Sequence, residues 1–432
     1  MTIGLLSLVI ALAIVSMMMF GIPLAFITGS IAVVVALAYH GTNGLTVVAS
    51  QVYSLVNEYL FVAVPMFLLM ATFLERSGVA HDLYEAMNLL GRRLRGGVAL
   101  QTLLVAVILA TTTGIVGGEV VLLGVIALPQ MLRLGYDPQL AIGTICAGGA
   151  LGAMIPPSIV LIVYGITAGV SIGDLFTASF VPGFLMALLY AGYIVIRVAL
   201  NPALAPMPDA DAPPVLSPAA ALGKVALPLG LVVAVLGSIY GGIASITEAA
   251  AVGAFGAALC AWQRGRLDLP MVRDAALQTM RTCGMVLWLT FGAAALIGVY
   301  GLVGGTRFAS GLLAGLDLPP MGILALMLAV IFVLGMVMDW IGITLLTMPI
   351  FVPVLKELGF DLVWFGVLFC ISVQISYLTP PFGPAAFFLK GVAPPEISLQ
   401  QIFRAVMPFI GLQLLALALV LIFPAIALWP LR

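Results

Sequence analysis

One segment of this chain occurs twice, and no other feature restricts the fold as much. The first copy, Leu134–Gly165, opens with LGYD and contains MIPPS, and the second copy, 224 positions later, opens with LGFD and contains LTPPFGP. The same shift superimposes further pairs without a gap: Pro129 on Pro353, Cys146 on Cys370, and Pro156-Pro157 on Pro380-Pro381. Agreement at so many positions in one register indicates an internal duplication.

Composition places the duplicated chain in a membrane. Of the 432 residues 63% are hydrophobic and only 8% are charged, whereas soluble domains contain roughly 25% charged residues. Apolar runs long enough to cross a hydrocarbon layer of ~30 Å recur throughout. We therefore predict an all-α polytopic membrane protein with these apolar segments: 3–20, 24–39, 53–75, 98–133, 139–170, 177–200, 225–240, 246–262, 281–303, 321–356, 362–390 and 402–429.

A polar stretch divides the chain. The sequence NPALAPMPDADAPPVLSP, from Asn201 to Pro218, is rich in Pro, Ala and Asp and cannot form a packed core. We predict a linker over 201–223, which joins a first repeat, 1–200, to a second repeat, 224–432.

Segments 98–133 and 321–356 are too long for one crossing, because a helix rises ~1.5 Å per residue. Each has a Gly-rich interruption, TTTGIVGGE at Thr111–Glu119 and GMVMDWIG at Gly335–Gly342. If each segment is a pair of crossings, each half crosses six times and the halves are parallel. If each is a re-entrant hairpin, each half crosses five times and the halves are inverted repeats.

Basic residues favour the hairpins, because Lys and Arg gather on the cytoplasmic side. The hairpin arrangement leaves only Arg307, Lys356 and Arg432 of the 16 basic residues on the other side. We predict inverted repeats with both termini in the periplasm, the first hairpin based in the cytoplasm and the second in the periplasm. Twelve simple crossings are the alternative. The residues predicted to be cytoplasmic are Arg76, Arg92, Arg93, Arg95, Arg133, Arg197, Lys224, Arg264, Arg266, Arg273, Arg281, Lys390 and Arg404.

Two Pro-Pro pairs predict broken helices at mid-membrane, within 139–170 and 362–390. Proline removes a backbone donor and clashes with the preceding turn, and lipid offers the freed groups no partner. Secondary transporters bind ions and substrates at such breaks. A simple structural kink is the alternative, but a break in both halves, each after a Gly-interrupted hairpin, favours a binding site.

The hairpin tips contain further candidates. Thr111, Thr112 and Thr113 place hydroxyls beside Gly114 and suit a small cation, although Thr and Gly also serve to pack helices closely. Glu119 and Asp339 are acids close to the two tips, and intramembrane acids are usually functional. Capping of the hairpin is the alternative role for each acid.

The remaining polar residues argue against an enzyme embedded in the membrane. His40 and His81 fall in predicted loops, and no Walker sequence is present. No Lys or Arg is near the centre of a predicted span, so an anionic substrate would be held by backbone amides, hydroxyls and ion charge. Trp340, at the second tip, does not fit the role of an interfacial anchor.

These segments resemble a known family. GYDPQLAIGTICAGGALGAMIPPSIVLIVYG, KELGFDLVWFGVLFCISVQISYLTPPFGPAAFFLKGVAP and GGIASITEAAAVGA are similar to the large membrane subunit of tripartite ATP-independent periplasmic (TRAP) transporters. The resemblance covers essentially the whole chain. It implies an elevator-type ion-transporter fold in the bacterial inner membrane, with sodium as the coupling ion and no other cofactor. It also implies a small four-helix membrane subunit, a periplasmic substrate-binding protein and a small organic acid as substrate, with no nucleic acid.

In that family, sodium binds between each hairpin tip and the neighbouring broken helix. The first tip is often a Ser-Gly-Ser-Ser run, where this chain has TTTG, and a Thr hydroxyl can replace a Ser hydroxyl as ligand. The resemblance implies sodium-binding residues at Thr111, Thr112, Thr113, Gly114, Gly149, Gly152, Pro156, Gly335, Asp339, Ser376, Thr379 and Pro380. We assign the substrate to Pro157, Ser158, Pro381, Gly383 and Glu119. A self-sufficient ion-coupled carrier of organic anions is the second hypothesis, and a membrane-embedded enzyme is the third.

Overall fold

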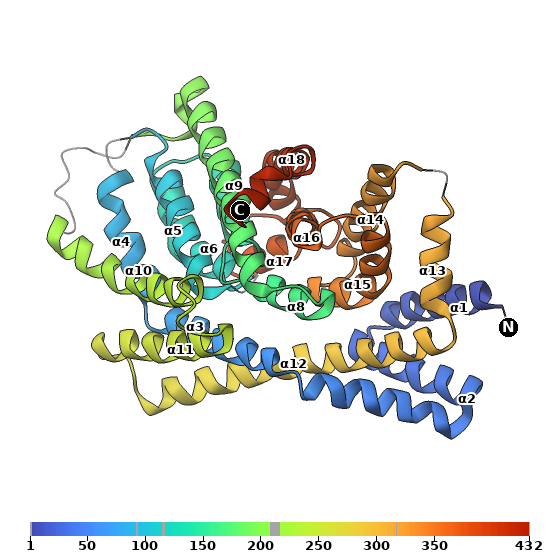
Figure 1. Ribbon diagram of the computed structural model, residues 1–432. Helices are drawn as coiled ribbons and strands as arrows, with labels where there is room; N and C mark the ends of the chain where they lie inside the picture. Colours follow the sequence, from blue (N-terminus) through green and yellow to red (C-terminus); the bar gives the residue numbers. More distant parts are fainter. Residues whose placement is uncertain (1, 92–93, 115–116, 208–216, 317, 432) are drawn as a thin grey trace.

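The computed structural model describes residues 2–91, 94–114, 117–207, 217–316 and 318–431. Every regular element in these ranges is a helix (Figure 1). The helices of the first half are α1 Ile3–Met19, α2 Leu24–Val56, α3 Ala63–Arg76, α4 Val79–Gly91, α5 Gly97–Thr113, α6 Gly118–Arg133, α7 Pro138–Ala150, α8 Ile159–Ala168 and α9 Ile172–Leu200. Those of the second half are α10 Pro218–Tyr240, α11 Ile246–Gln263, α12 Leu269–Leu302, α13 Gly305–Ala314, α14 Pro320–Gly335, α15 Trp340–Glu357, α16 Leu362–Leu378, α17 Pro384–Lys390, α18 Leu399–Ile422 and α19 Ala425–Leu428. Short 3₁₀ helices are η1 Tyr59–Val62, η2 Leu151–Ala153, η3 Pro202–Leu204 and η4 Trp429–Leu431.

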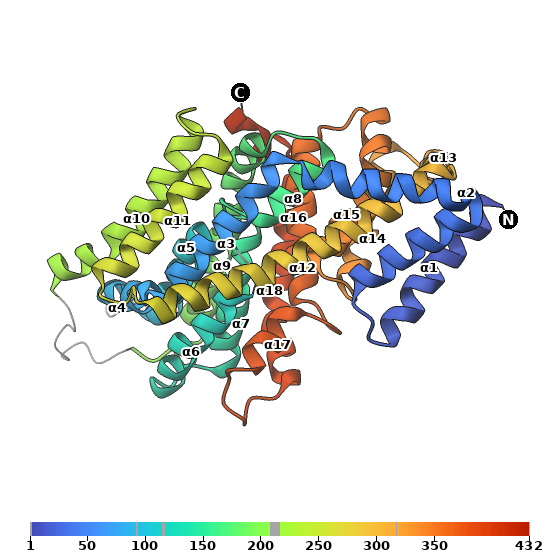
Figure 2. The same cartoon turned by 90° about the horizontal axis from the view of Figure 1, so that it is seen from below.

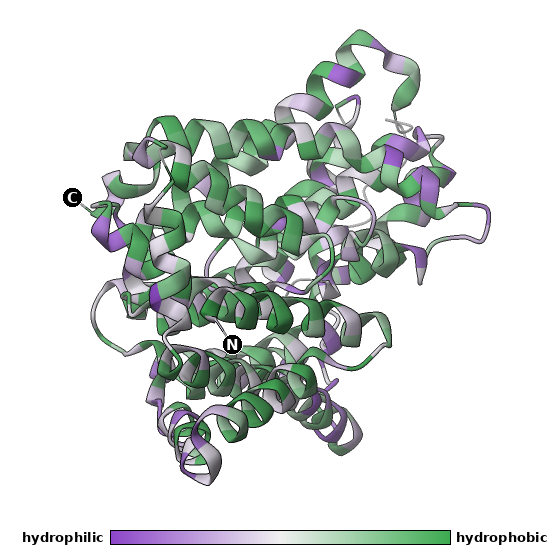
Figure 3. Ribbon diagram, turned by 90° about the vertical axis from the view of Figure 1, so that its right-hand side faces the viewer, coloured by the Kyte–Doolittle hydropathy of each residue, from purple (hydrophilic) through white to green (hydrophobic). Residues whose placement is uncertain are grey.

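Helix length and composition agree with a polytopic membrane protein. Within the described ranges, seven helices are long and apolar enough to cross a membrane. Hydrophobic residues make up most of the helices, and hydrophilic ones gather mainly at loops and helix ends at the periphery (Figure 3). The prediction of an all-α polytopic membrane protein is therefore confirmed.

Two long helices form one side of the molecule. Figures 1 and 2 show α2 and α12 side by side, and Gly29 of α2 lies against Gly292 of α12, where a Cβ would come within 3.8 Å of the neighbouring Cα. Small residues at such a crossing allow close approach of helix backbones. With α1, these helices enclose a small apolar core that is separate from the large core of the molecule. Helices α5–α9 and α14–α18 all lie on the same side of the α2–α12 pair, above it in Figure 1.

One predicted interruption is a kink in place of a loop. The sequence suggested two spans, 24–39 and 53–75, with His40 in a loop, but His40 is helical and the break between the two helical parts of α2 is confined to its neighbour Gly41. Gly41 adopts a non-helical backbone (φ 59°, ψ −151°) and bends the chain, after which the helix resumes. Glycine pays little for that conformation because it has no Cβ. His81, also expected in a loop, lies in the amphipathic helix α4.

The repeated LG-aromatic-Asp turn has the same structure in both halves. Gly135 and Gly359 adopt positive φ values of 77° and 74°. In each turn the following Asp begins a helix by accepting a backbone hydrogen bond, Asp137 from Leu140 at 3.0 Å and Asp361 from Trp364 at 2.9 Å. An Asp at this position is a favoured N-cap. The turn therefore fixes the start of α7 and of α16, the two helices that lead to the Pro-Pro pairs.

A helix begins within the predicted linker, 201–223. α10 begins at Pro218, where the hydroxyl of Ser217 accepts a hydrogen bond from the Ala220 amide at 3.3 Å. Residues 208–216, which include Ala212, lie outside the described residues. Proline suits the first position of a helix, because its missing N–H has no partner there in any case.

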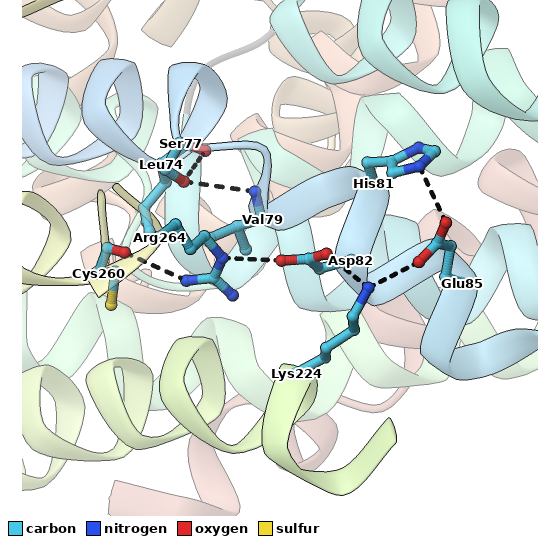
Figure 4. A network of polar contacts seen from close by, with 9 residues as sticks. All are labelled: Leu74, Ser77, Val79, His81, Asp82, Glu85, Lys224, Cys260 and Arg264. Atoms are coloured by element: carbon cyan, nitrogen blue, oxygen red, sulfur yellow. Dashed lines mark hydrogen bonds and ion pairs between the residues drawn. The ribbon is translucent and has the colours of Figure 1, made fainter. Parts of the chain in front are cut away.

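Charged side chains attach α4 to α10 and α11 (Figure 4). Asp82 pairs with Arg264 at 2.7 Å and with Lys224 at 2.9 Å, and Lys224 also reaches Glu85 at 2.6 Å. Glu85 in turn contacts His81 at 3.1 Å. Burial raises the pKa of Asp82, but hydrogen bonds from Arg264 and Lys224 outweigh burial and hold that pKa below its usual value.

The α4 network joins residues predicted to be on the cytoplasmic side. Lys224 and Arg264 take part in it, and Arg266 lies against Gly78, one turn before Asp82. Of the other residues in that prediction, Arg92 and Arg93 lie outside the described residues. Which side of the membrane this network faces stays a prediction.

Candidate functional site

Both long segments divide into two helices that contact each other. The break in 98–133 falls after Gly114, which ends α5 with a left-handed backbone (φ 56°), and α6 follows at Gly118. The break in 321–356 separates Gly335, at the end of α14, from Trp340, at the start of α15. Each tip predicted from a Gly-rich run therefore lies between two helices that contact each other.

The Pro-Pro pairs interrupt the next helices, as predicted. The first pair lies between η2 and α8, and the second lies between α16 and α17. The peptide bonds Pro156-Pro157 and Pro380-Pro381 are both cis. We call residues 154–158 break 1 and residues 379–383 break 2.

The first tip touches break 1 directly. The carbonyl of Gly114 accepts a hydrogen bond from the amide of Ile159, the first residue of α8, at 3.3 Å. A Cβ at position 114 would collide with the carbonyl oxygen of Pro157, so both the positive φ and the close approach require glycine here.

The tip hydroxyls turn back to their own helix. Thr111 donates to the carbonyl of Ile108 at 2.7 Å, and Thr112 donates to that of Leu109 at 2.8 Å. Each hydroxyl oxygen keeps lone pairs that can accept or coordinate. The side chain of Thr113 lies outside the described residues.

Glycines in and beside η2 make room for the start of α6. Gly149 lies against Val120, and Gly152 lies against the carboxyl group of Glu119, where a Cβ would come within 2.5 Å of Oε1. Glu119 is fully buried. The structure thus brings together three predicted residues, Gly149, Gly152 and Glu119, on the α6 side of break 1.

The side chain of Ser158 forms a hydrogen bond across break 1. Its hydroxyl donates to the carbonyl of Ala153 at 2.6 Å, and the side chain is fully buried. This hydroxyl proton is therefore used within the protein.

The second tip contacts α16 just before break 2. Gly335 lies so close to Ser376 that a Cβ would overlap the serine side chain. The Ser376 hydroxyl lies 3.0 Å from the Ser372 carbonyl and 3.3 Å from the Phe332 carbonyl, so it can bond within α16 or across to α14. The predicted pair of Gly335 and Ser376 is in direct contact.

Asp339 has the capping role that was the alternative for it. Its carboxylate begins α15 by accepting a hydrogen bond from the amide of Ile341 at 3.3 Å. An anionic N-cap also interacts favourably with the helix dipole. Capping and a place at the cavity described below are compatible, because a carboxylate has two oxygens.

Break 2 has its own polar contacts. The Thr379 hydroxyl donates to the Ile375 carbonyl at 2.6 Å. Gly383 has φ 29°, and a Cβ there would come within 3.0 Å of the Thr379 carbonyl. The chain thus folds back on itself between α16 and α17.

Backbone carbonyls are available at both breaks. Among the described residues, none donates a hydrogen bond to the carbonyls of Met154, Ile155, Pro156 or Pro157, or to those of Thr379, Pro380, Pro381 or Phe382. Unwound carbonyls of this kind coordinate cations in secondary transporters. Of these carbonyls, that of Pro157 lies directly against the first tip, at Gly114.

A cavity of about 290 Å³ is lined by residues of both tips. Gly114 and Ile159 contribute from the first half, and Gly335, Asp339 and Ser376 from the second. The other lining residues are Leu68, Thr282, Met285, Val286, Met338, Trp340, Ile341, Ile343, Val373, Tyr377, Phe382, Pro384 and Phe388. The five residues assigned to substrate do not line it, although their chain neighbours Ile159, Phe382 and Pro384 do.

Sequence reasoning missed the wall of the cavity that comes from α3 and α12. Leu68, Thr282, Met285 and Val286 carry no motif and lie far from the Pro-Pro pairs in sequence. Only the packing of α3 and α12 against the tips brings them there. A larger crevice of about 720 Å³ lies between α1, α2, α12 and α14–α15, but its lining is almost entirely apolar and includes neither break.

A helical membrane chain with two paired-helix tips and two broken helices around one cavity belongs to the class of secondary transporters. Residues 9–426 match the family described as tripartite ATP-independent periplasmic transporter, DctM component. The chain belongs to this family, and it is a large permease subunit rather than an enzyme.

Relatives with different substrates in their names cover most of the chain. It is 32% identical to the C4-dicarboxylate TRAP transporter large permease protein DctM of Pseudomonas aeruginosa, over 88% of each chain. It is 30% identical to the ectoine/5-hydroxyectoine TRAP transporter large permease protein UehC of Ruegeria pomeroyi, over 85% of each chain. The isethionate TRAP transporter permease protein DctMQ of Oleidesulfovibrio alaskensis is 28% identical, over 95% of this chain and 64% of its own length.

Solved structures share the fold. The MtrF structure from Neisseria gonorrhoeae has a TM-score of 0.65 at 17% identity, covering 90% of this chain and 85% of its own. The YdaH transporter of Alcanivorax borkumensis has a TM-score of 0.61 at 19% identity, covering 91% and 90%. At this level of identity the likeness concerns the fold alone.

Proposed function

We propose that this permease takes up a small organic acid across the bacterial inner membrane by sodium symport, after a periplasmic binding protein delivers the acid. The observation that carries the proposal is the convergence of two tip–break contacts on one cavity. Gly114 meets break 1 there, and Gly335 meets Ser376 beside break 2. A cation at either contact would hold a tip against its broken helix, so ion binding and cavity shape would be coupled.

The proposed partners follow from the family. A TRAP system comprises a small membrane subunit and a periplasmic binding protein, and the isethionate relative is named as a DctMQ permease. We propose that the small subunit is a four-helix protein that associates with this chain in the bilayer. The names of the relatives, which include dicarboxylate, ectoine and isethionate, support a small polar solute without selecting one.

The proposed transport cycle is an elevator. Helices α5–α9 and α14–α18 carry both breaks, whereas α3 and α12 provide the remaining cavity wall. Movement of the first group past α12 would expose the cavity to alternate sides of the membrane. A reducible cross-link between Thr282→Cys on α12 and Phe382→Cys in break 2, both at the cavity, should arrest uptake, and reduction should restore it. Full uptake with the cross-link in place would contradict the elevator.

Reconstitution tests the coupling ion and the partners together. The chain and its small subunit are placed in proteoliposomes, with the binding protein outside, and uptake of radiolabelled mono- and dicarboxylates is measured. We expect uptake under an inward sodium gradient and none under an equal potassium gradient. Uptake that follows a proton gradient alone would refute sodium coupling and implicate Glu119 or Asp339 as a proton carrier. Uptake without the binding protein would support the self-sufficient carrier instead.

A further inference from the structure

The cavity between the tips has an aromatic wall. Trp340 begins α15, Tyr377 lies near the end of α16, Phe382 lies in break 2 and Phe388 lies on α17. Phe382 and Phe388 expose 45% and 43% of their surface. Most of the other lining side chains are aliphatic or Met. Such a wall favours a ligand with an apolar, flat body, because aromatic rings stack or meet edge to face.

Charge at the cavity is sparse and negative. Among the described residues that line it, Asp339 is the only one with a charged side chain, and none is Lys, Arg or His. The Asp339 carboxylate is engaged at the start of α15. A carboxylate held away from water needs a cation or hydrogen-bond donors. A co-transported cation at a tip can balance one substrate carboxylate, but a second one would face the aromatic wall and Asp339.

Trp340 acquires a role in this arrangement. Its sequence position did not fit an interfacial anchor, and the structure places it at the second tip beside the cavity and only partly exposed. An indole at this point adds a large flat surface next to the tip that contacts Ser376.

We propose that the cavity takes a monocarboxylate with a flat apolar body, of the arylacetate type, and discriminates against C4-dicarboxylates. This inference rests on the proposed function, since it names the substrate class of the same cavity. The aromatic wall binds the ring, and the single carboxylate faces the tip contacts where the cation binds.

Ligand-dependent thermal stability tests the substrate class without a gradient. The purified chain with its small subunit is heated in sodium chloride with phenylacetate or with succinate, over a range of concentrations, because a ligand that binds the folded state raises the melting temperature. We expect phenylacetate to raise it and succinate to leave it unchanged. In Trp340→Ala, about tenfold more phenylacetate should be needed to raise the melting temperature by the same amount. The matched control, Trp429→Ala, removes a Trp that is 70% exposed and is not among the residues that line the cavity, and should leave the effect intact.

A second variant is expected to gain a response to a ligand, which a folding defect would not produce. Met285→Lys places a cation in the wall contributed by α12, and we expect succinate to stabilise this variant. The inference would be overturned if succinate stabilised the native chain at least as strongly as phenylacetate does. It would also be overturned if neither compound had an effect. An unchanged phenylacetate effect in Trp340→Ala would also overturn it. A phenylacetate effect that is equal in potassium chloride would support the substrate class and refute sodium coupling, so the two proposals fail separately.

Discussion

The side-chain amide of Gln374 donates a hydrogen bond of 2.8 Å to the backbone carbonyl of Ala150, and these two residues are separated by the repeat distance of 224 positions. Ala150 is the last residue of α7, directly before η2, and Gln374 lies in α16, two residues before Ser376. Equivalent positions of the two copies therefore bond to each other. This contact joins α7 and α16, the helices that lead to the two breaks.

We expect Gln374→Leu to weaken the coupling between the two tip–break contacts. The variant removes the hydrogen bond that Gln374 donates to the Ala150 carbonyl, and removing one partner of a buried hydrogen bond costs about 1–3 kcal/mol. A coupling loss of that size corresponds to roughly a 5–150-fold change in apparent affinity. The measurement is sodium-dependent uptake, whose Hill coefficient should fall towards one. Gln413→Leu, which changes another fully buried glutamine, on α18, is the control and should keep the native Hill coefficient.

Gly335→Ala should lower sodium affinity without unfolding the chain. The added Cβ would overlap the side chain of Ser376 and push α14 away from α16. Overpacking costs about 1–3 kcal/mol, so the sodium concentration for half-maximal uptake should rise about tenfold. The matched control is Gly192→Ala on α9, where a Cβ meets no heavy atom within 4 Å. Equal sodium dependence in both variants would show that the Gly335–Ser376 contact has no part in ion binding.

Asp82→Asn should destabilise the α4 network in a pH-dependent manner. Because the folded pKa of Asp82 is lowered, its ion pairs stabilise the protein above the unfolded pKa of about 3.9, and this stabilisation is lost as the pH falls through the folded pKa. Partly exposed ion pairs contribute about 0.2–1 kcal/mol each. The variant should melt a few degrees below the native chain at neutral pH, and the two curves should converge in acid. Glu396→Gln, at an exposed position, is the control; a gap that persists below the folded pKa would contradict the assignment.

Much of the fold was predictable because membrane insertion and helix interruption leave direct marks in sequence. Long apolar runs indicated the spans, the Gly-rich runs marked both tips, and the Pro-Pro pairs marked both breaks. The repeated LGYD and LGFD sequences marked the start of each copy, and Asp137 and Asp361 both prove to be helix caps.

Other features left no such mark. The amphipathic helices α4 and α13 contain too few consecutive apolar residues to be found by a search for spans. The break in α2 is confined to the backbone conformation of one residue, Gly41, which hydropathy does not report. The α12 wall of the cavity, with Thr282 and Met285, depends on tertiary packing between segments far apart in sequence.

The predicted inversion of the two halves can be tested by labelling single cysteines. In a background where Cys283 is replaced by Ala, Ala212→Cys in the linker should react with an impermeant maleimide only from the cytoplasm. Lys356→Cys, at an exposed position near the end of α15, should react only from the periplasm. The reason is the concentration of basic residues on one side under the hairpin arrangement. Labelling of Ala212→Cys from the periplasm would rule out the predicted topology.

The Pro-Pro pairs provide the most direct test of the binding site. Changing both prolines of one pair to Ala restores two backbone donors and removes the ring clash, so that the helix can continue through the break. Helix propensity favours this closure by ~3 kcal/mol for each Pro replaced, which exceeds a typical coupling energy of ~1–3 kcal/mol between ligands. The carbonyls at Met154–Pro157 or Thr379–Phe382 would then bond within the helix and no longer face an ion.

We therefore expect Pro156→Ala/Pro157→Ala and Pro380→Ala/Pro381→Ala to insert and fold but to lose most sodium-dependent uptake. Pro228→Ala, in the interior of α10 and away from the cavity lining, is the control and should transport normally. Insertion is checked by membrane yield and by gel filtration with the small subunit. If the prolines are only kinks, both double variants will transport with near-native sodium affinity, and the assignment of ion sites to the breaks will have to be abandoned.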